Sequence, residues 1–489
     1  MKTLPIAFRS PSLRNLLCLP FLLGIAAAAK PNILFIAVDD LRPQLGCYGE
    51  SWIKSPNIDR LAQRGLRFDR AYCQEAICMS SRASLLSGYR PNHGKIYNNG
   101  PLFEHVPDAL TLNQHFLNHG YEALSLGKIY HHSGDKKKGW SQPAFDPKGE
   151  WFGRSYLAEA SRREVERYEK ENPTERRQGM GPAYEAPDVD DNAYPDGVIA
   201  TRAISELQRL AGRKDNTPFF LAVGFMKPHL PFNAPKRYWD LYNPEKLPLA
   251  PERAAPKGAP KPAHTGWNEL RGYHGMPKSG PMPADEERKL IHGYAACVSY
   301  VDSMIGRVLD EVKRLGLKEN TIVVLWGDHG FKLGDLGMWC KHTNFERDTR
   351  VPLIVSAPGM KALGKSTAAL TELVNLYPTL CELAGIELPA HLQGTSFAPL
   401  LDDPSKLWKS AAFSQFPRGE VMGYTMRTEH HRYTEWRRLA DGKVIAREWY
   451  DHREDPEETN NLANKPKFAA QLDDFSARMR AGYAAAVPR

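Results

Sequence analysis

Two stretches of the sequence decide the fold: residues 32–40, NILFIAVDD, and residues 321–329, TIVVLWGDH. Each begins with a short apolar run, and such runs are typical of strands buried on both faces of a parallel sheet. Further strand-like runs at 123–126 and 218–224 alternate with helical patterns, which lie at 58–64, 80–87, 112–119 and 290–315. This alternation predicts an α/β fold in which helices sandwich a large mixed, mostly parallel sheet.

Acidic side chains stand where an active site is expected in such a fold. Asp39 and Asp40 directly follow the first run, and Asp328 and His329 follow the second; ligands of open α/β sheets bind beyond the carboxyl ends of the strands. Taken singly, each pair is compatible with a turn or a helix cap. Together they would place three carboxylates and an imidazole in one crevice, where the repulsion between carboxylates requires a cation. Ligands of this kind favour a hard divalent ion, and we expect Ca²⁺ because it tolerates irregular geometry.

The composition of the whole chain is that of a globular protein. It has 489 residues, of which 42% are hydrophobic and 25% charged, which excludes disordered, collagen-like and coiled-coil proteins. The formal charge of +8 is compatible with an anionic substrate. Beyond a Pro/Asp turn at 402–405, short alternating runs and a final helix predict a small C-terminal α+β subdomain with an antiparallel sheet. We therefore expect a catalytic domain at residues 30–403 and this subdomain at 404–489.

The N-terminus has the pattern of a secretory signal peptide. Basic residues precede an apolar segment at 16–25, and four alanines follow at 26–29. The pattern predicts a signal peptide over residues 1–29, cleaved after Ala27 or Ala29, and hence a periplasmic or secreted protein. Cys18 as a lipid-attachment site is disfavoured because Leu17 precedes it. No later apolar run is long enough to suggest a membrane span.

The segment of residues 78–88, CMSSRASLLSG, carries the most specific pattern. Cys78 stands at the start of a predicted helix, where backbone N–H groups stabilise negative charge, and Arg82 follows one turn later. On these residues alone, a buried structural cysteine and a thiolate nucleophile both remain open. No local Cys-His-Asn pattern supports the thiolate.

Residues 78–88 resemble the signature of the type I sulfatases, Cys-x-Pro/Ala-Ser-Arg followed by Leu-x-x-Gly, whose cysteine is oxidised after translation to formylglycine (3-oxoalanine). Ser80 stands where that family has Pro or Ala, in the stretch that the formylglycine-generating maturase reads. The resemblance extends along the mature chain through residues 38–43, 46–49, 55–59, 127–128, 227–229, 327–330 and Lys341. Residues 41–49 and 422–428 are similar to the iduronate-2-sulfatase branch of the family.

The resemblance implies an alkaline-phosphatase-like sandwich and a sulfuric ester hydrolase that uses one Ca²⁺ ion. The metal ligands that it implies are Asp39, Asp40, modified Cys78, Asp328 and His329, although the family often has Asn at the last position. The hydrated aldehyde at Cys78 would attack sulfur with one oxygen, and its second hydroxyl would then expel sulfate.

The resemblance also assigns roles to the surrounding basic side chains. His229 would protonate the leaving oxygen, and His131 would act as the base when sulfate is expelled. His131 is preferred over its neighbour His132 because of its spacing from Lys128. The two lysines Lys128 and Lys341 would hold sulfate oxygens, and Arg82 would steady the diol.

The expected substrate is a sulfated sugar, either of a glycosaminoglycan or of a marine polysaccharide or oligosaccharide. Two alternatives remain open. The first is a phosphate or phosphonate ester hydrolase of the same superfamily, which shares the metal-ligand pattern. The second is a non-catalytic binder of sulfated glycans, if Cys78 is not matured. We expect no nucleic-acid partner and no membrane span.

Overall fold

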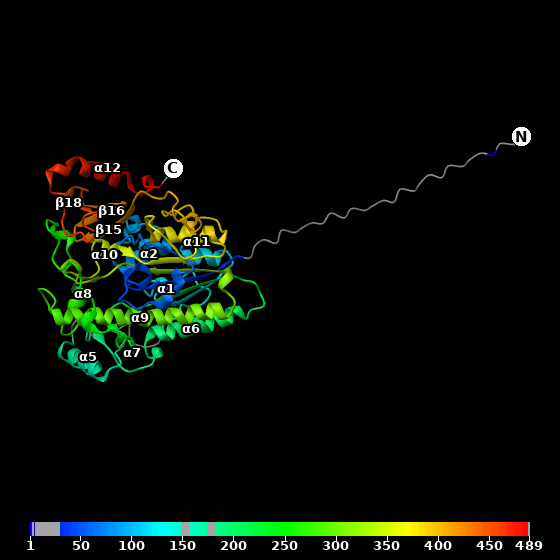
Figure 1. Ribbon diagram of the computed structural model, residues 1–489, viewed down its shortest axis with the longest axis horizontal. Coiled ribbons are helices and arrows are strands. Elements are labelled where there is room, and N and C mark those ends of the chain that lie inside the picture. The colour runs from blue at the N-terminus through cyan, green and yellow to red at the C-terminus, as the bar shows by residue number, and fades with distance from the viewer. Residues whose placement is uncertain (2–3, 5–29, 148–155, 174–180, 488–489) are drawn as a thin grey trace.

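The main body of the protein is built round a seven-stranded sheet (Figure 1). The computed structural model describes residues 30–147, 156–173 and 181–487, besides Met1 and Leu4, so that nearly all of the expected signal peptide lies outside the described residues. In spatial order the strands are β13 (Lys365–Thr367), β2 (Leu66–Phe68), β12 (Leu353–Ser356), β8 (Thr321–Gly327), β1 (Asn32–Val38), β6 (Phe219–Phe225) and β4 (Glu122–Gly127).

This sheet is mixed but mostly parallel, as the sequence predicts. Strand β1 pairs in parallel with β6 and with β8, β4 pairs in parallel with β6, and β13 with β2. Strand β12 runs antiparallel to both of its neighbours. In the central pair Val38 lies opposite Gly327, so the residues that follow β1 and β8 emerge side by side at one edge of the sheet.

Helices cover both faces of the sheet and account for its continuous apolar strands. Leu34 and Ile36 of β1 belong to one core, whose main helices are α1 (Pro56–Ala62), α6 (Pro195–Ala211) and α9 (Ala284–Arg314). The intervening Ile33 and Phe35 belong to a second core with α2 (Cys78–Ser87), α4 (Leu112–Asn118) and α11 (Leu376–Ala384). Figure 1 shows α6 and α9 below the sheet and α2 and α11 above it.

A four-stranded antiparallel sheet near the C-terminus forms the expected smaller subdomain. Its strands, in order, are β15 (Ala412–Arg418), β16 (Val421–Arg427), β17 (His431–Arg438) and β18 (Val444–Asp451). Helix α12 (Ala469–Ala485) packs Phe475 against Tyr433 and Trp449 of this sheet. The Ser414 hydroxyl donates to the carbonyl of Cys73 at 2.5 Å and thereby joins the small sheet to the main body.

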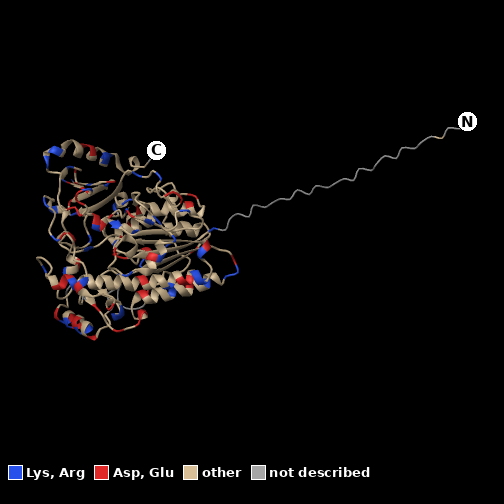
Figure 2. Ribbon diagram, in the orientation of Figure 1, with Lys and Arg blue, Asp and Glu red and all other residues tan. Residues whose placement is uncertain are grey.

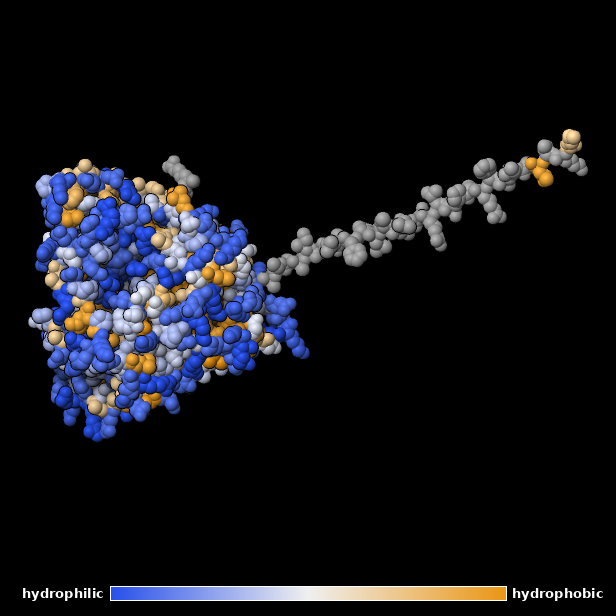
Figure 3. All heavy atoms as spheres, in the orientation of Figure 1, coloured by the Kyte–Doolittle hydropathy of each residue, from blue (hydrophilic) through white to orange (hydrophobic). Residues whose placement is uncertain are grey.

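Shorter elements fill the connections. They are α3 (Leu102–His105), α5 (Glu159–Glu171), α7 (Lys236–Trp239), α8 (Asn268–Arg271), α10 (Glu346–Thr349), β3 (Ala71–Tyr72), β5 (Tyr184–Glu185), β7 (Phe232–Asn233), β9 (Lys332–Leu333), β10 (Trp339–Cys340), β11 (Arg350–Val351) and β14 (Thr371–Glu372). Among the described helices, none has the length and apolar composition that crossing a membrane requires. Charged residues of both signs cover α5 and α12 (Figure 2), and the face shown in Figure 3 is mostly hydrophilic.

Candidate active site

The two acidic pairs meet at the edge of the central sheet, as their positions in the sequence predict. Asp39 and Asp40 follow β1, Asp328 and His329 follow β8, and all four side chains are buried. The Asp40 backbone N–H donates to Asp328 Oδ1 at 3.0 Å, and His329 Nε2 lies 3.3 Å from Asp40 Oδ1. Asp40 has a φ of 57°, a left-handed conformation that Asp tolerates better than most residues. The pairing of β1 with β8 therefore builds one compact polar cluster.

Cys78 is the first residue of helix α2 and faces this cluster. Its Sγ atom lies 3.1 Å from His329 Nε2 and 3.9 Å from Asp40 Oδ1. Burial, followed by the neighbouring Asp39 carboxylate, raises the pKa of the Cys78 thiol well above its usual value. The unmodified side chain is therefore a neutral thiol, which disfavours the thiolate nucleophile that the sequence left open.

Arg82 lies one turn along α2 and links the two acidic pairs. Its Nη2 donates to Asp39 Oδ1 at 3.0 Å, and its Nε donates to Asp328 Oδ2 at 2.9 Å. The guanidinium also donates to the carbonyls of Lys128 and Ile129 and lies over the Trp326 ring. Because Arg82 is fully buried and saturated with partners, it fixes the carboxylates in place and has little freedom to contact a substrate.

Two lysines bring positive charge to the two carboxylates that follow β1. Lys128, which follows β4, pairs with Asp39, and Lys341, which follows β10, lies 3.0 and 2.9 Å from the two carboxylate oxygens of Asp40. Burial alone would raise the pKa of Asp39, but the charges of Lys128 and Arg82 hold this pKa well below its usual value.

The backbone on either side of Lys341 is strained. Cys340 has a φ of 62° and His342 a φ of 83°. Non-glycine residues in the left-handed region cost about 1–3 kcal/mol each and gather at functional sites. These conformations therefore mark the segment that brings Lys341 to Asp40.

The donor set fits a hard divalent cation. Ligand atoms of Asp39, Asp40, Cys78 and His229 lie within 4.8 Å of one another, and so do those of Cys78 with Asp328 and His329. His329 Nδ1 lies 2.9 Å from the Gly330 carbonyl and so carries the proton, which leaves the Nε2 lone pair directed toward the cluster. Burial raises the pKa of Asp328, and the nearby Asp39 carboxylate adds to that effect. A cation among these donors would relieve the crowding of lone pairs and carboxylates.

His229 and Glu269 form a dyad beside the cluster. His229 Nδ1 donates to the Leu230 carbonyl at 2.6 Å, while Nε2 lies 3.2 Å from Glu269 Oε1. Only a protonated imidazole can donate in both directions, so this geometry suits a general acid. Glu269 also lies 3.0 Å from Lys341 Nζ. Burial alone would raise the pKa of Glu269, but Lys341 and His229 hold this pKa well below its usual value.

Sequence reasoning missed Glu269. It belongs to the four-residue helix α8, within a long irregular connection, and it forms part of no motif. Only the folded chain brings α8 against the residues that follow β6 and β10, with which Glu269 forms its contacts.

His131 lies near the cluster without a hydrogen bond to it. Its imidazole is half-buried, and its Nδ1 has no hydrogen-bond partner within the described part of the chain. Burial, followed by the charge of Lys128, lowers the pKa of His131 to about 2. The ring is therefore neutral and a weak base in this state, and it makes an edge-to-face contact with His132 at 4.8 Å between ring centroids.

Ser80, the departure from the family signature, is buried in the first turn of α2. Its hydroxyl is within hydrogen-bond distance of Glu75 Oε1 at 3.2 Å and of the Ile96 carbonyl at 3.1 Å. Burial raises the pKa of Glu75 well above its usual value, which favours the protonated carboxyl. The serine therefore joins α2 to the loop at Ile96, a contact that proline or alanine would not provide.

Comparisons with known proteins agree with this geometry. The family model described as Sulfatase matches residues 31–386, and the model described as N-sulphoglucosamine sulphohydrolase, C-terminal, matches residues 334–483. Iduronate 2-sulfatase of Mus musculus is 32% identical over 92% of this chain and 94% of its own. The structure of BT4656 in complex with its substrate D-glucosamine-2-N,6-O-disulfate has a TM-score of 0.72 at 23% identity and covers 92% of this chain and 97% of that one. The phosphonate monoester hydrolase of Agrobacterium radiobacter has a TM-score of 0.71 at 22% identity, covering 92% and 95%.

Proposed function

The chain belongs to the sulfatase family and is a sulfuric ester hydrolase; we propose that its nucleophile is Cys78 after oxidation to formylglycine. One observation carries this proposal. Cys78 begins a buried helix and faces a cluster of three carboxylates and an imidazole, which two lysines flank. An ordinary cysteine there is a neutral thiol of low reactivity, whereas an aldehyde hydrate would present two hydroxyl groups to the same cluster.

We further propose that the acidic cluster holds one Ca²⁺ ion. The ligands would be Asp39, Asp40, Asp328 and His329, together with residue 78 in its modified form. When bound, the ion would neutralise charge on the sulfate ester and acidify the hydroxyl of the hydrate. Arg82 holds Asp39 and Asp328 at fixed positions for this purpose, since it donates to both.

The remaining side chains divide the proton transfers and the binding of sulfate between them. One oxygen of the hydrated residue 78 would attack sulfur in line with the leaving alcohol, and loss of the proton from the second hydroxyl would restore the aldehyde and expel sulfate. His229 would protonate the leaving oxygen, since its ring nitrogens lie 2.6 Å from the Leu230 carbonyl and 3.2 Å from Glu269 Oε1, two acceptors that suit a protonated imidazole. His131, whose Nδ1 has no hydrogen-bond partner among the described residues, would accept the proton of the second hydroxyl. Burial and the charge of Lys128 lower the pKa of this imidazole, so a bound sulfate would have to offset that charge for the transfer to occur. Lys128 and Lys341 would bind sulfate oxygens.

The substrate class that we propose is a sulfated sugar, with a 2-sulfated uronate of a glycosaminoglycan or a sulfated marine polysaccharide as the candidates. The similarity to iduronate 2-sulfatase over most of both chains supports this substrate class.

We also propose that residues 1–29 are a signal peptide, which implies a periplasmic or secreted enzyme. N-terminal sequencing of the mature protein tests it, and we expect Ala28 or Lys30 as the first residue.

Turnover of paired esters tests the proposed reaction. Protein produced with a formylglycine-generating maturase should hydrolyse 4-methylumbelliferyl sulfate much faster than 4-methylumbelliferyl phosphate, and Cys78→Ala should abolish the reaction. A preference for the phosphate or a phosphonate ester would favour the other hydrolases that share this fold. Tight binding of sulfated glycans with no release of sulfate would favour a non-catalytic binder.

A further inference from the structure

A groove lies between the main body and the C-terminal sheet, apart from the cluster round Cys78. It consists of two adjoining cavities of about 620 and 400 Å³, which share Arg70, Ala368, Glu429 and His430. We call it the Arg70 groove. One cavity continues along residues 404–410 toward Arg478, and the other along Arg350 toward Arg453.

The Arg70 groove carries an excess of positive charge. Eight of the residues that line the two cavities are Lys or Arg, whereas four are Asp or Glu. Three of these acids already have a basic partner: Asp69 pairs with Arg67, Glu346 with Arg427 and Arg432, and Glu457 with Arg347. The fourth, Glu429, is exposed.

Four of the cations have no carboxylate partner. Among the residues that the structure describes, no Asp or Glu lies within ion-pair distance of Arg70, Arg350, Lys406 or Arg478. Arg70 instead donates from Nε to the Ala368 carbonyl at 2.7 Å and from Nη1 to the Glu429 carbonyl at 2.9 Å. Arg350 donates from Nε to the Asp69 carbonyl at 2.7 Å. Neutral carbonyls hold these guanidinium groups in place without cancelling their charge, which leaves them ready to bind anions.

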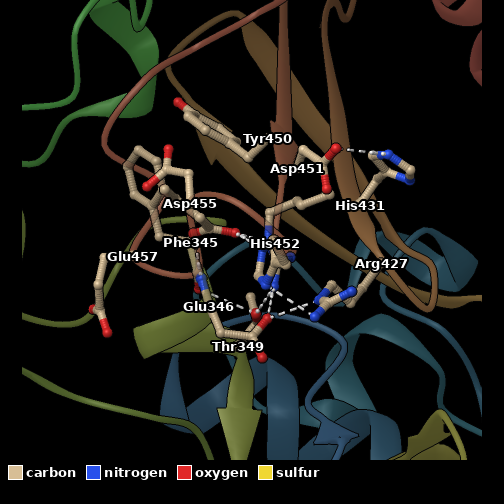
Figure 4. Close-up of polar contacts among 12 residues, drawn as sticks. Phe345, Glu346, Thr349, Arg427, His431, Tyr450, Asp451, His452, Asp455 and Glu457 are labelled. Carbon is tan, nitrogen blue, oxygen red and sulfur yellow. Dashed lines mark hydrogen bonds and ion pairs between the residues drawn. The ribbon is translucent and has the colours of Figure 1, made fainter.

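A buried ionic network braces the wall of the groove (Figure 4). Arg427 donates to His452 Nδ1 at 2.9 Å, and Arg432 donates to Glu346 and to Glu458, each at 2.6 Å. The acceptor atoms of Glu346, His452 and Glu458 lie close enough together to hold a metal ion. Two guanidinium groups already neutralise both carboxylates, however, so this network is a rigid connection between α10 and the strands β16 and β17.

Arg70 and Arg350 of the groove lie at the same edge of the main sheet as the residues round Cys78. Leu353 of β12 lies opposite Trp326 near the carboxyl end of β8, and Arg350 precedes Leu353 by three residues. Arg67 of β2 lies opposite Ile354, and Arg70 follows three residues later. Two strand spacings, about 10 Å, separate the backbone of β2 from that of β8.

We infer that the Arg70 groove is a second binding site, which holds the sulfated or carboxylated chain of a polysaccharide while another of its sugars occupies the catalytic cluster. This inference rests on the proposed function, because it takes a polyanionic saccharide as the substrate. Uncompensated guanidinium groups fixed in a long groove match the charge and the shape of such a chain.

Binding of fluorescein-labelled heparin to the full-length chain tests the inference. We would compare Cys78→Ala protein with the same protein carrying Arg70→Ser and Arg350→Ser, or Lys406→Glu and Arg478→Glu. The matched control carries Arg162→Ser and Lys170→Ser, which remove two exposed cations from α5. At about 50 mM salt, where screening is weak, we expect each groove pair to weaken binding roughly tenfold and the control pair less than twofold.

Small esters separate this inference from the proposed function. With Cys78 intact and matured, the groove variants should hydrolyse 4-methylumbelliferyl sulfate at the wild-type rate, because that ester cannot reach the groove. Unchanged heparin affinity in both groove variants, or an equal loss in the control, would overturn the second site. Tighter binding of a DNA duplex than of heparin would overturn its assignment to a saccharide. Failure of the wild-type enzyme to cleave any sulfate ester would instead refute the proposed function.

Discussion

Replacement of Glu269 by glutamine tests how the site prepares its general acid. Glutamine keeps the size and an acceptor oxygen, but it removes the negative charge that lies 3.2 Å from His229 Nε2 and 3.0 Å from Lys341 Nζ. At these distances each attraction is about 5 kcal/mol gross for an effective dielectric constant near 20. The net worth of a hydrogen bond to a charged group is smaller, about 1.5–3 kcal/mol.

We therefore expect Glu269→Gln to lower kcat roughly thirtyfold, which corresponds to about 2 kcal/mol. The value of KM should change much less, because Lys341 keeps its contact with Asp40. Steady-state hydrolysis of an aryl sulfate measures both quantities.

The matched control is Glu206→Gln on α6, which removes a buried carboxylate that also pairs with two basic residues, Arg202 and Arg209. It should lower stability and leave kcat unchanged, and Glu269→Asp should restore part of the lost rate. A Glu269→Gln enzyme with kcat within twofold of wild type would refute the role that we give to Glu269. So would an equal loss of kcat in the control.

Three further predictions concern the metal, the signature and the fold. Removal of divalent ions with EDTA should abolish turnover and lower the melting temperature, and Ca²⁺ should restore both better than Mg²⁺; full activity after exhaustive chelation would contradict a metal site. Ser80→Ala should cost about 1 kcal/mol of stability through its lost hydrogen bond, yet should be matured at least as completely, as peptide mass spectrometry would show; loss of maturation would mean that the maturase reads Ser80 itself. Burial raises the pKa of Asp302 to about 6. The folded chain therefore binds the proton of this carboxyl more tightly than the unfolded chain does. As the pH rises from about 4 to 6 and the proton is lost, the folded state should lose about 3 kcal/mol of stability. Urea unfolding should show a weaker pH dependence in Asp302→Asn, and an unchanged dependence would exclude this carboxyl as its source.

The sequence predicts those parts of the site that follow directly from strands. The apolar runs at β1 and β8 are continuous because both faces of the sheet are covered, so their carboxyl ends and the adjoining Asp39, Asp40, Asp328 and His329 can be read from the pattern. The parallel pairing of these strands then brings the four side chains together.

Features that depend on long-range packing leave no such pattern. Glu269 reaches the site from a four-residue helix in an irregular connection, and Pro417 and polar residues interrupt the alternation of β15. Charged residues such as Arg432 and Glu458 resemble surface residues in the sequence, yet they are buried against one another. Their burial becomes visible only when the C-terminal sheet is placed beside α10.

The chemical state of residue 78 tests the proposed nucleophile most directly. Tryptic cleavage after Arg70 and Arg82 releases the peptide of residues 71–82, which contains Cys78. In protein that hydrolyses sulfate esters, we expect this peptide to carry the aldehyde, with the corresponding loss of mass relative to the cysteine form. Active enzyme in which the peptide contains only unmodified cysteine would contradict it.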